Sequence, residues 1–387
     1  MQLPVLHFEL TEYAERLERT RASLKARGLD GVLLFSIEDM YWLTGLDSDG
    51  FYVFHCLYVG ANGHIEYLTR RVDGPNVSYS SIIEHCRFWD ERAGAGRGDV
   101  ILRMLQDLEL GGKRVGLQLA SLGMRADLYL DVQNSVGRFC ELVPASDVVG
   151  ALRRVKSPAE LAYMRKAATI CEEMRETALK LTRPGKFDKD IFAELAAIPY
   201  RHDGDPSALR WPGGAGAAAF NQRYYSGRNR IMENDRVTFE IGCGYRHYHA
   251  AIYFIALTGP SPNPRNQRLH EMCLEILEVG QAAMRPGNVI GDIHDAARRV
   301  YEKHGFGHSV LKSLGYNMGA TFPPTWVDQP MITEGQDTEL QEGMVLFFHP
   351  TIHDHDADLC VALAEQAVVW QDGVEKITSA PKEIAVV

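Results

Sequence analysis

The chain has 387 residues, of which 45% are hydrophobic and 24% charged, and a formal net charge of −10. This length suits two domains of ordinary globular composition. The negative balance argues against a nucleic-acid or anionic-membrane partner, because such sites need clustered Lys and Arg. No run approaches the ~20 apolar residues of a membrane helix. Seven scattered cysteines without a CxxC pair, and an acidic N-terminus without a signal-peptide core, predict a cytoplasmic protein with reduced thiols.

Strand and helix patterns alternate through the first part of the chain. Residues 10–28 have helical periodicity with a Gly stop, and a buried strand, LDGVLLFS, follows. Asn62-Gly63 predicts a tight hairpin turn between two further strands. We therefore predict an α/β domain over residues 1–152. A dinucleotide-binding fold is poorly supported, because no GxGxxG motif follows the first strand.

A long amphipathic helix marks the start of a second domain, residues 153–387. Ser157 is placed to cap it, Pro158 to occupy its first position, and Glu160 lies in its first turn. The helix ends at an RPG triplet, and a shorter helix follows. The same order of long helix, RPG triplet and second helix occurs again later in the chain. This repeat predicts two similar helix pairs packed on a sheet.

The stretch VTFEIGCGYRHYHAAIYFIALTG, residues 237–259, alternates apolar and polar residues on both sides of GYR. This pattern predicts two antiparallel strands joined by a tight turn. Glu240 lies between Phe239 and Ile241, and a carboxylate in an apolar run is costly to bury unless it is paired or used. The return strand carries His249 past it. A solvent-facing Glu is the commoner explanation, but we favour a functional one.

Several motifs together resemble the creatinase and aminopeptidase P family. They are KSPAELAYMRKAA, the two RPG helix pairs, the 237–259 hairpin, SLGYNMGATFPPTW, EGMVLFFHP and LAEQAVVWQDG. They span almost the whole chain in a specific order. The resemblance implies an α/β (α+β) protein with a smaller creatinase-type N-terminal domain over 1–152 and a pita-bread catalytic domain over 153–387. It also implies a homodimer.

The metallopeptidases of this family bind two metal ions through two Asp, one His and two Glu. At the corresponding positions this chain has Glu240, Ala251, Tyr316, His349 and Glu365. An alanine cannot supply the carboxylate that holds two dications ~3.5–4 Å apart. The resemblance therefore implies no dinuclear site and no cofactor. A single ion on Glu240, His349 and Glu365 is a less favoured alternative.

Within the family the chain is most similar to the metal-free ectoine hydrolase group, which opens a C–N bond of a small amidine-like substrate. We predict the same reaction type here, on a cyclic amidine or guanidino compound that is cationic or zwitterionic. Glu240 is the candidate nucleophile or base, and Glu365 would share its proton or hold the amidinium. His249 and His349 are candidate acid–base imidazoles, and Tyr316 is either a proton donor or filler for the vacated metal space.

Trp326, Phe322 and Trp211 are candidate walls for a small cation, with ordinary core packing as the alternative. Arg223 stands where creatinase-like enzymes carry a catalytic His, and it is a candidate to bind a substrate carboxylate. A solvated basic turn is the commoner explanation for Arg223. Two other functions stay open: a lyase acting on a small zwitterion with a single metal, and a non-catalytic binding protein.

Overall fold

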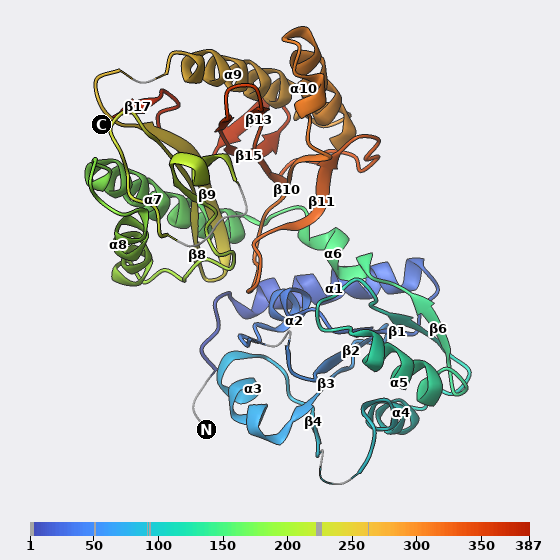
Figure 1. The fold of residues 1–387 in the computed structure, drawn as a ribbon. Coiled ribbons are helices and arrows are strands. Elements are labelled where there is room, and N and C mark those ends of the chain that lie inside the picture. Colours follow the sequence, from blue (N-terminus) through green and yellow to red (C-terminus); the bar gives the residue numbers. More distant parts are fainter. Residues whose placement is uncertain (1–3, 50–51, 91, 93, 222–226, 262) are drawn as a thin grey trace. The chain divides into compact units, whose positions relative to one another are not determined.

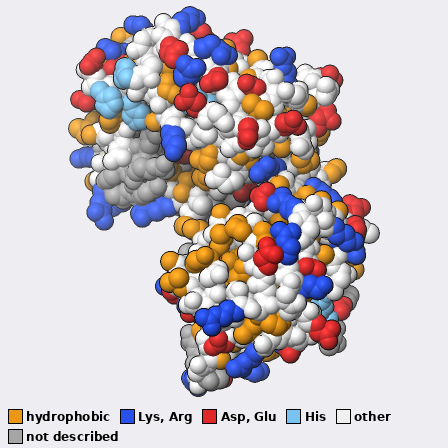
Figure 2. Space-filling view, turned by 90° about the vertical axis from the view of Figure 1, so that its right-hand side faces the viewer, with side chains coloured by type: hydrophobic (Ala, Val, Ile, Leu, Met, Phe, Trp, Pro, Cys, Tyr) orange, Lys and Arg blue, Asp and Glu red, His pale blue; other side chains and the backbone are white. Residues whose placement is uncertain are grey.

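The computed structural model describes residues 4–49, 52–90, 92, 94–221, 227–261 and 263–387 (Figure 1). The chain divides into two compact units, Met1–Arg153 and Arg154–Val387, next to the boundary expected from the sequence. None of the helices in the described ranges is both long and apolar enough to cross a membrane. Figure 2 shows acidic and basic side chains interspersed over the visible face.

The N-terminal unit is a six-stranded mixed sheet with helices packed against it, as the alternation predicts. Its helices are α1 Leu10–Ala26, α2 Ile37–Thr44, α3 Gly74–Ser80, α4 Arg97–Asp107, α5 Ala126–Val136 and α6 Asp147–Arg153. Its strands are β1 Gly31–Leu34, β2 Cys56–Gly60, β3 Ile65–Arg70, β4 Cys86–Trp89, β5 Arg114–Leu117 and β6 Glu141–Pro144, in the order β4-β3-β2-β1-β5-β6. The Asn62-Gly63 turn joins β2 to β3, which pair antiparallel.

The C-terminal unit contains two helix pairs and two larger sheets. Its helices are α7 Pro158–Leu181, α8 Asp188–Arg201, α9 Arg265–Ala283 and α10 Ile290–Lys303. One sheet has the order β17-β9-β8-β7, made of β7 Gly213–Ala215, β8 Arg236–Tyr245, β9 Tyr248–Leu257 and β17 Ala385–Val386. The other has the order β11-β10-β12-β15-β16, made of β10 Ser313–Asn317, β11 Asp328–Thr333, β12 Val345–Phe348, β15 Glu365–Trp370 and β16 Gly373–Lys376. A separate hairpin joins β13 Thr351–Asp354 to β14 Leu359–Ala362.

Each helix pair covers one sheet, so the predicted repeat corresponds to two halves rather than to two pairs on a single sheet (Figure 1). On the first sheet, Cys171 of α7 lies with its Sγ 3.6 Å from that of Cys243 on β8. On the second, Gly280 of α9 packs so closely on the Phe348 ring that a Cβ would clash with it. The two uncovered faces therefore turn toward each other. This is the pita-bread architecture that the resemblance implies.

The start of α7 is fixed by the capping box expected from the sequence. Ser157 Oγ accepts the Glu160 N–H at 3.2 Å, and Glu160 Oε2 accepts the Ser157 N–H at 2.7 Å. The second oxygen of Glu160 accepts the hydroxyl of Tyr248 at 2.6 Å. A cap of this kind contributes about 1 kcal/mol, and here it also ties the helix to the first residue of β9.

The turn between β8 and β9 is formed by Arg246 and His247, which follow Tyr245, the central residue of the GYR triplet. Arg246 and His247 have φ angles of 53° and 64°, the geometry of a two-residue hairpin turn that usually needs Asn or Gly. Two acidic side chains stabilise it. Asp205 Oδ2 accepts the His247 N–H at 2.7 Å, and Asp203 pairs with the Arg246 guanidinium at 2.7 Å.

Candidate functional site

Glu240 lies on the uncovered face of the β8–β9 hairpin and is partly exposed. Residues directly opposite each other in an antiparallel pair share a face. From Glu240 toward the turn, the pairs on this face are Glu240–Tyr253, Gly242–Ala251 and Gly244–His249. His249 is therefore paired four residues along the strand from Glu240, not beside it. Next to the carboxylate the face is lined by small residues and one tyrosine.

The facing sheet contributes a row of aromatic and polar side chains. The register aligns Tyr316 with Phe347 and Phe347 with Gln366, so these three point the same way. His349 follows two residues after Phe347. Its ring centroid lies 5.4 Å from that of Tyr316 and 5.6 Å from that of Phe347. A phenol and an imidazole thus lie together on the uncovered face of this sheet.

Trp326 and Gln366 join the two faces. The Trp326 indole N–H donates to the Tyr316 hydroxyl oxygen at 2.6 Å, and its ring packs where a Cβ on Gly242 would be. The Gln366 side chain accepts the Ala251 N–H at 3.2 Å and donates to the His249 carbonyl at 3.0 Å. Both contacts are buried. The layer that holds Glu240 therefore also holds Tyr316 and His349.

The structure does not support the acid–base role predicted for His249. Its Nδ1 lies 2.8 Å from the His247 carbonyl and its Nε2 accepts the Ala208 N–H at 3.0 Å, so both ring nitrogens are engaged by backbone. Burial lowers the pKa of His249 to about 4, against the opposing effect of the His247 carbonyl. A neutral, fully paired imidazole fixes the hairpin and the Ala208 loop.

The lowered pKa of His249 predicts acid destabilisation. An unfolded histidine, with its pKa near 6.5, takes up a proton as pH falls below that value, whereas the folded one stays neutral until about pH 4. Stability is thus present above pH 6.5 and is lost on the way down to pH 4. Between pH 7 and pH 5 this loss is about 2 kcal/mol of unfolding free energy. His55 in the N-terminal unit, whose pKa burial also lowers to about 4, adds a similar loss there.

Urea denaturation at pH 7 and pH 5 measures this effect. In His249→Gln we expect lower stability at pH 7 but a pH dependence smaller by about 2 kcal/mol in the unfolding of the C-terminal unit. His55→Gln is the matched control, because it should change only the N-terminal unit's dependence. An unchanged pH slope in the His249 variant would contradict the assignment of a neutral buried imidazole.

Glu365 faces away from the candidate site, contrary to its predicted partnership with Glu240. It pairs with Phe348, whose ring packs on α9, so its carboxylate lies on the helix-covered face of β15. There Glu365 Oε2 lies 3.4 Å from Lys382 Nζ and 3.6 Å from Lys376 Nζ. Side chains alternate along a strand, so the residue that faces the site is the next one, Gln366.

The predicted aromatic walls are engaged in packing. Phe322 is buried and stacks on the His247 ring with centroids 4.1 Å apart. The Trp211 indole donates to the Gly242 carbonyl at 2.8 Å and lies beside Phe192 of α8. Trp326 is fully buried and contacts the site through Tyr316. Arg223 lies outside the described residues.

Two residues of the site were missed in the sequence. Phe347 was hidden inside the apolar run MVLFFHP, where alternation gives no signal. Gln366 was overlooked beside the more conspicuous Glu365. Side chains alternate along a strand, so Gln366 faces the site if Glu365 faces the helices. Assigning Glu365 to the helix-covered face would therefore have identified Gln366.

The five positions that hold metal ions in the metallopeptidases do not offer a dinuclear site here. The Ala251 side chain has no ligating atom, and the Tyr316 hydroxyl accepts a hydrogen bond from Trp326. The Glu365 carboxylate points to two lysines on the opposite face. Glu240 and His349 are the two that keep a ligating group on the site face. Among the described residues no group of three or more His, Cys, Asp or Glu is arranged to hold a metal ion. This donor set does not fit two dications.

Two sheets, each covered by a helix pair, define the pita-bread class, and here they follow a separate N-terminal domain in the chain. The chain belongs to metallopeptidase family M24, whose model matches residues 162–374. Residues 16–155 match the creatinase/prolidase N-terminal domain. Both matches agree with the family and fold inferred from the sequence.

Relatives within the family differ in their reactions. Ectoine hydrolase of Halomonas elongata is 26% identical over 98% of both chains. A Xaa-Pro dipeptidase of Pyrococcus furiosus is 23% identical over 63% of this chain and 68% of its own. Among solved structures, the dipeptidase PepE of Mycobacterium ulcerans superimposes with a TM-score of 0.86 at 21% identity, covering 98% of this chain and 99% of its own. The structural likeness shows the shared fold.

Proposed function

We propose that this protein is a hydrolase that opens a C–N bond of a small cationic or zwitterionic amidine or guanidino compound without a metal ion. The observation that carries the proposal is the loss of the family's dinuclear ligand set: Ala251 has no side-chain donor, and Glu365 lies on the helix-covered face of its sheet. Glu240 remains on the same strand face as Ala251, and Tyr316 and His349 lie together on the facing sheet. The full-length similarity to an ectoine hydrolase supports the same reaction type.

In the proposed mechanism Glu240 takes a proton from a water molecule as the water oxygen attacks the amidine carbon. The C–N bond then breaks, and the leaving nitrogen receives a proton from His349 or Tyr316. The Trp326 indole N–H donates to the Tyr316 hydroxyl oxygen at 2.6 Å, and this contact orients the phenol. The carboxylate of Glu240 also offers a counter-charge to the cationic substrate.

Peptide-bond hydrolysis is the second candidate, because dipeptidases share the fold and part of the sequence. Elemental analysis of the purified protein, together with a binding screen, separates the two. We expect less than one tenth of a zinc, manganese, cobalt or iron ion per chain, unchanged after chelation and dialysis. Two ions per chain with turnover of Xaa-Pro dipeptides would overturn our proposal in favour of the peptidase.

The same preparation can be screened by thermal shift against ectoine, hydroxyectoine, creatine and betaines. A ligand present at 100 times its dissociation constant adds about 2.7 kcal/mol of stability. Stabilisation by one of these zwitterions, and none by Xaa-Pro dipeptides, is the expected result. We also propose that the protein acts as a cytoplasmic homodimer, because the family resemblance implies a homodimer and seven scattered cysteines without a CxxC pair indicate reduced thiols.

A further inference from the structure

A small cavity lies between α9 and the residues that follow α10, and Glu240 is not among the residues that line it. Its volume is about 240 Å³. Seven residues line it: Arg268, Leu269, Glu271, Met272, Glu275, His304 and Phe306. At ~30 Å³ per liquid water, this is room for roughly eight waters, or for a ligand of about ten non-hydrogen atoms.

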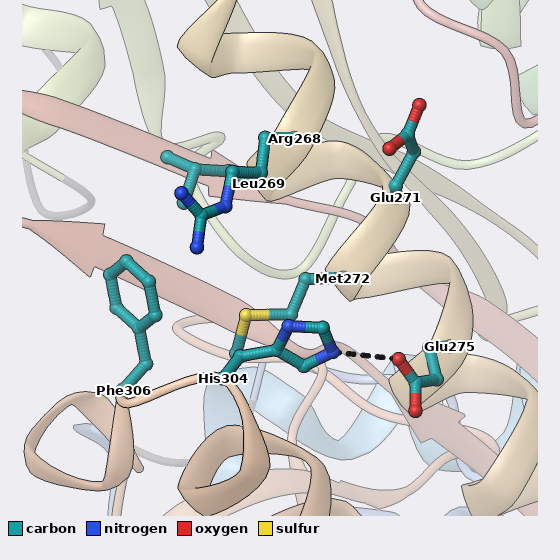
Figure 3. A pocket seen from close by; sticks show the side chains of 7 residues that line it. All are labelled: Arg268, Leu269, Glu271, Met272, Glu275, His304 and Phe306. Atoms are coloured by element: carbon teal, nitrogen blue, oxygen red, sulfur yellow. Dashed lines mark hydrogen bonds and ion pairs between the residues drawn. The ribbon is translucent and has the colours of Figure 1, made fainter.

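The floor and one wall of the cavity are apolar. Leu269 and Met272 are buried members of the helical core, and the Phe306 ring stands opposite Met272 (Figure 3). A flexible thioether beside an aromatic ring adapts to flat or branched apolar groups. The cavity therefore suits a ligand with a compact hydrocarbon body.

The charges around the cavity are unequally satisfied. Glu275 accepts from His304 Nε2 at 2.8 Å and pairs with Lys303 Nζ at 2.7 Å, so its charge is compensated. Figure 3 shows Glu271 directed away from the cavity, whereas the Arg268 guanidinium extends over the space between Phe306 and Met272. In the part of the chain that the structure describes, no ion pair or side-chain hydrogen bond to Arg268 is found. Arg268 is exposed to solvent, so the cavity has a hydrated cation at its rim that no described side chain neutralises.

We propose that this cavity binds a small organic monocarboxylate with an apolar body of one ring or a branched chain. Its carboxylate would pair with Arg268, and its body would lie against Met272 and Phe306. The site is distinct from the Glu240 layer, yet α9 connects the two. Cys273, the residue after Met272, points its Sγ toward the carbonyls of Val361 and of Pro350, which follows His349.

Isothermal titration of the full-length protein with sodium benzoate tests the site, with neutral benzamide as the uncharged analogue. We expect millimolar binding of benzoate and none of benzamide. Arg268→Gln should weaken benzoate binding about threefold to fivefold, because solvent screens an ion pair with this exposed guanidinium. Arg285→Gln, near the other end of α9, is the matched control and should bind as the wild type does.

Phe306→Ser provides a second, independent test, because it removes the apolar wall without touching the charge. It should also weaken benzoate binding severalfold. Glu240→Gln should leave benzoate binding unchanged, which separates this site from the proposed active site. Equal binding of benzoate to the wild type and to Arg268→Gln, equal binding of benzamide, or no binding of benzoate would each overturn the proposal.

Discussion

Glu240→Gln is expected to lower turnover of the substrate by about 10³-fold. The substitution keeps the size and hydrogen-bonding shape of the side chain but removes the proton acceptor and the negative charge. The backbone of Glu240 stays in the β8–β9 ladder, and its N–H still donates to the Pro212 carbonyl at 3.2 Å. We therefore expect a melting temperature close to that of the wild type, measured beside the steady-state rate.

A matched control is Glu375→Gln on β16. Glu375 pairs with Arg165 at the surface, so its loss should cost less than about 1 kcal/mol and leave turnover unchanged. The measurement uses the zwitterion that the thermal-shift screen identifies. Turnover in Glu240→Gln above about one tenth of the wild-type rate would remove Glu240 as the base.

The local parts of this structure were predictable because the determining contacts are close in sequence. The Ser157 and Glu160 capping box at the start of α7, the Asn62-Gly63 turn and the β8–β9 hairpin each depend on residues within a few positions of one another. The order of motifs along the whole chain indicated the family. These features follow from backbone propensity and from apolar periodicity, both of which a sequence displays directly.

Strand faces near the C-terminus were not predictable in the same way. The apolar run EGMVLFFHPTIHD has the pattern of one strand, but it is interrupted at His349-Pro350 and forms β12 and β13. In LAEQAVV, a shift of one residue exchanges the buried face for the site face, and the sequence alone does not say which of Glu365 and Gln366 faces inward.

His249 shows the other limit of the sequence. Its role is set by Ala208, far away along the chain, whose N–H occupies the ring nitrogen that catalysis would need. A hydrogen bond between residues so far apart leaves no periodic pattern. The sequence therefore predicted the hairpin that carries Glu240 and His249, but the contacts of the individual side chains could be learned only from the fold.

Lys382→Met should destabilise the C-terminal unit by about 2–4 kcal/mol, because it strands a buried carboxylate. Glu365 is 1% exposed, and Lys382 is the nearer of its two lysine partners. Lys382 also donates to the Ala364 carbonyl at 2.8 Å. Burial lowers the pKa of this lysine even though Glu365 opposes that shift. Urea denaturation at pH 7 measures the loss.

The double variant Lys382→Met, Glu365→Gln tests whether the loss comes from the unpaired charge. With the carboxylate neutralised, stability should return to within about 1 kcal/mol of the wild type, since a buried ion pair is worth little relative to a neutral pair. Lys376→Met is the control: Lys376 is 54% exposed, and its removal should cost less than about 1 kcal/mol. A double variant as unstable as the single one would contradict the pairing.

The Glu365–Lys382 contact links β15 to the C-terminal tail, which in turn pairs with β9. Lys382 belongs to the C-terminal tail, and β17 of that tail pairs in parallel with β9 at Ala256 and Leu257. A side chain at a position that binds metal in relatives thus anchors the tail against the strand opposite Glu240. Glu365→Gln should then change unfolding free energy and leave metal content as it is in the wild type. If Glu365 were a metal ligand, Glu365→Gln would instead lower the metal content of the purified protein.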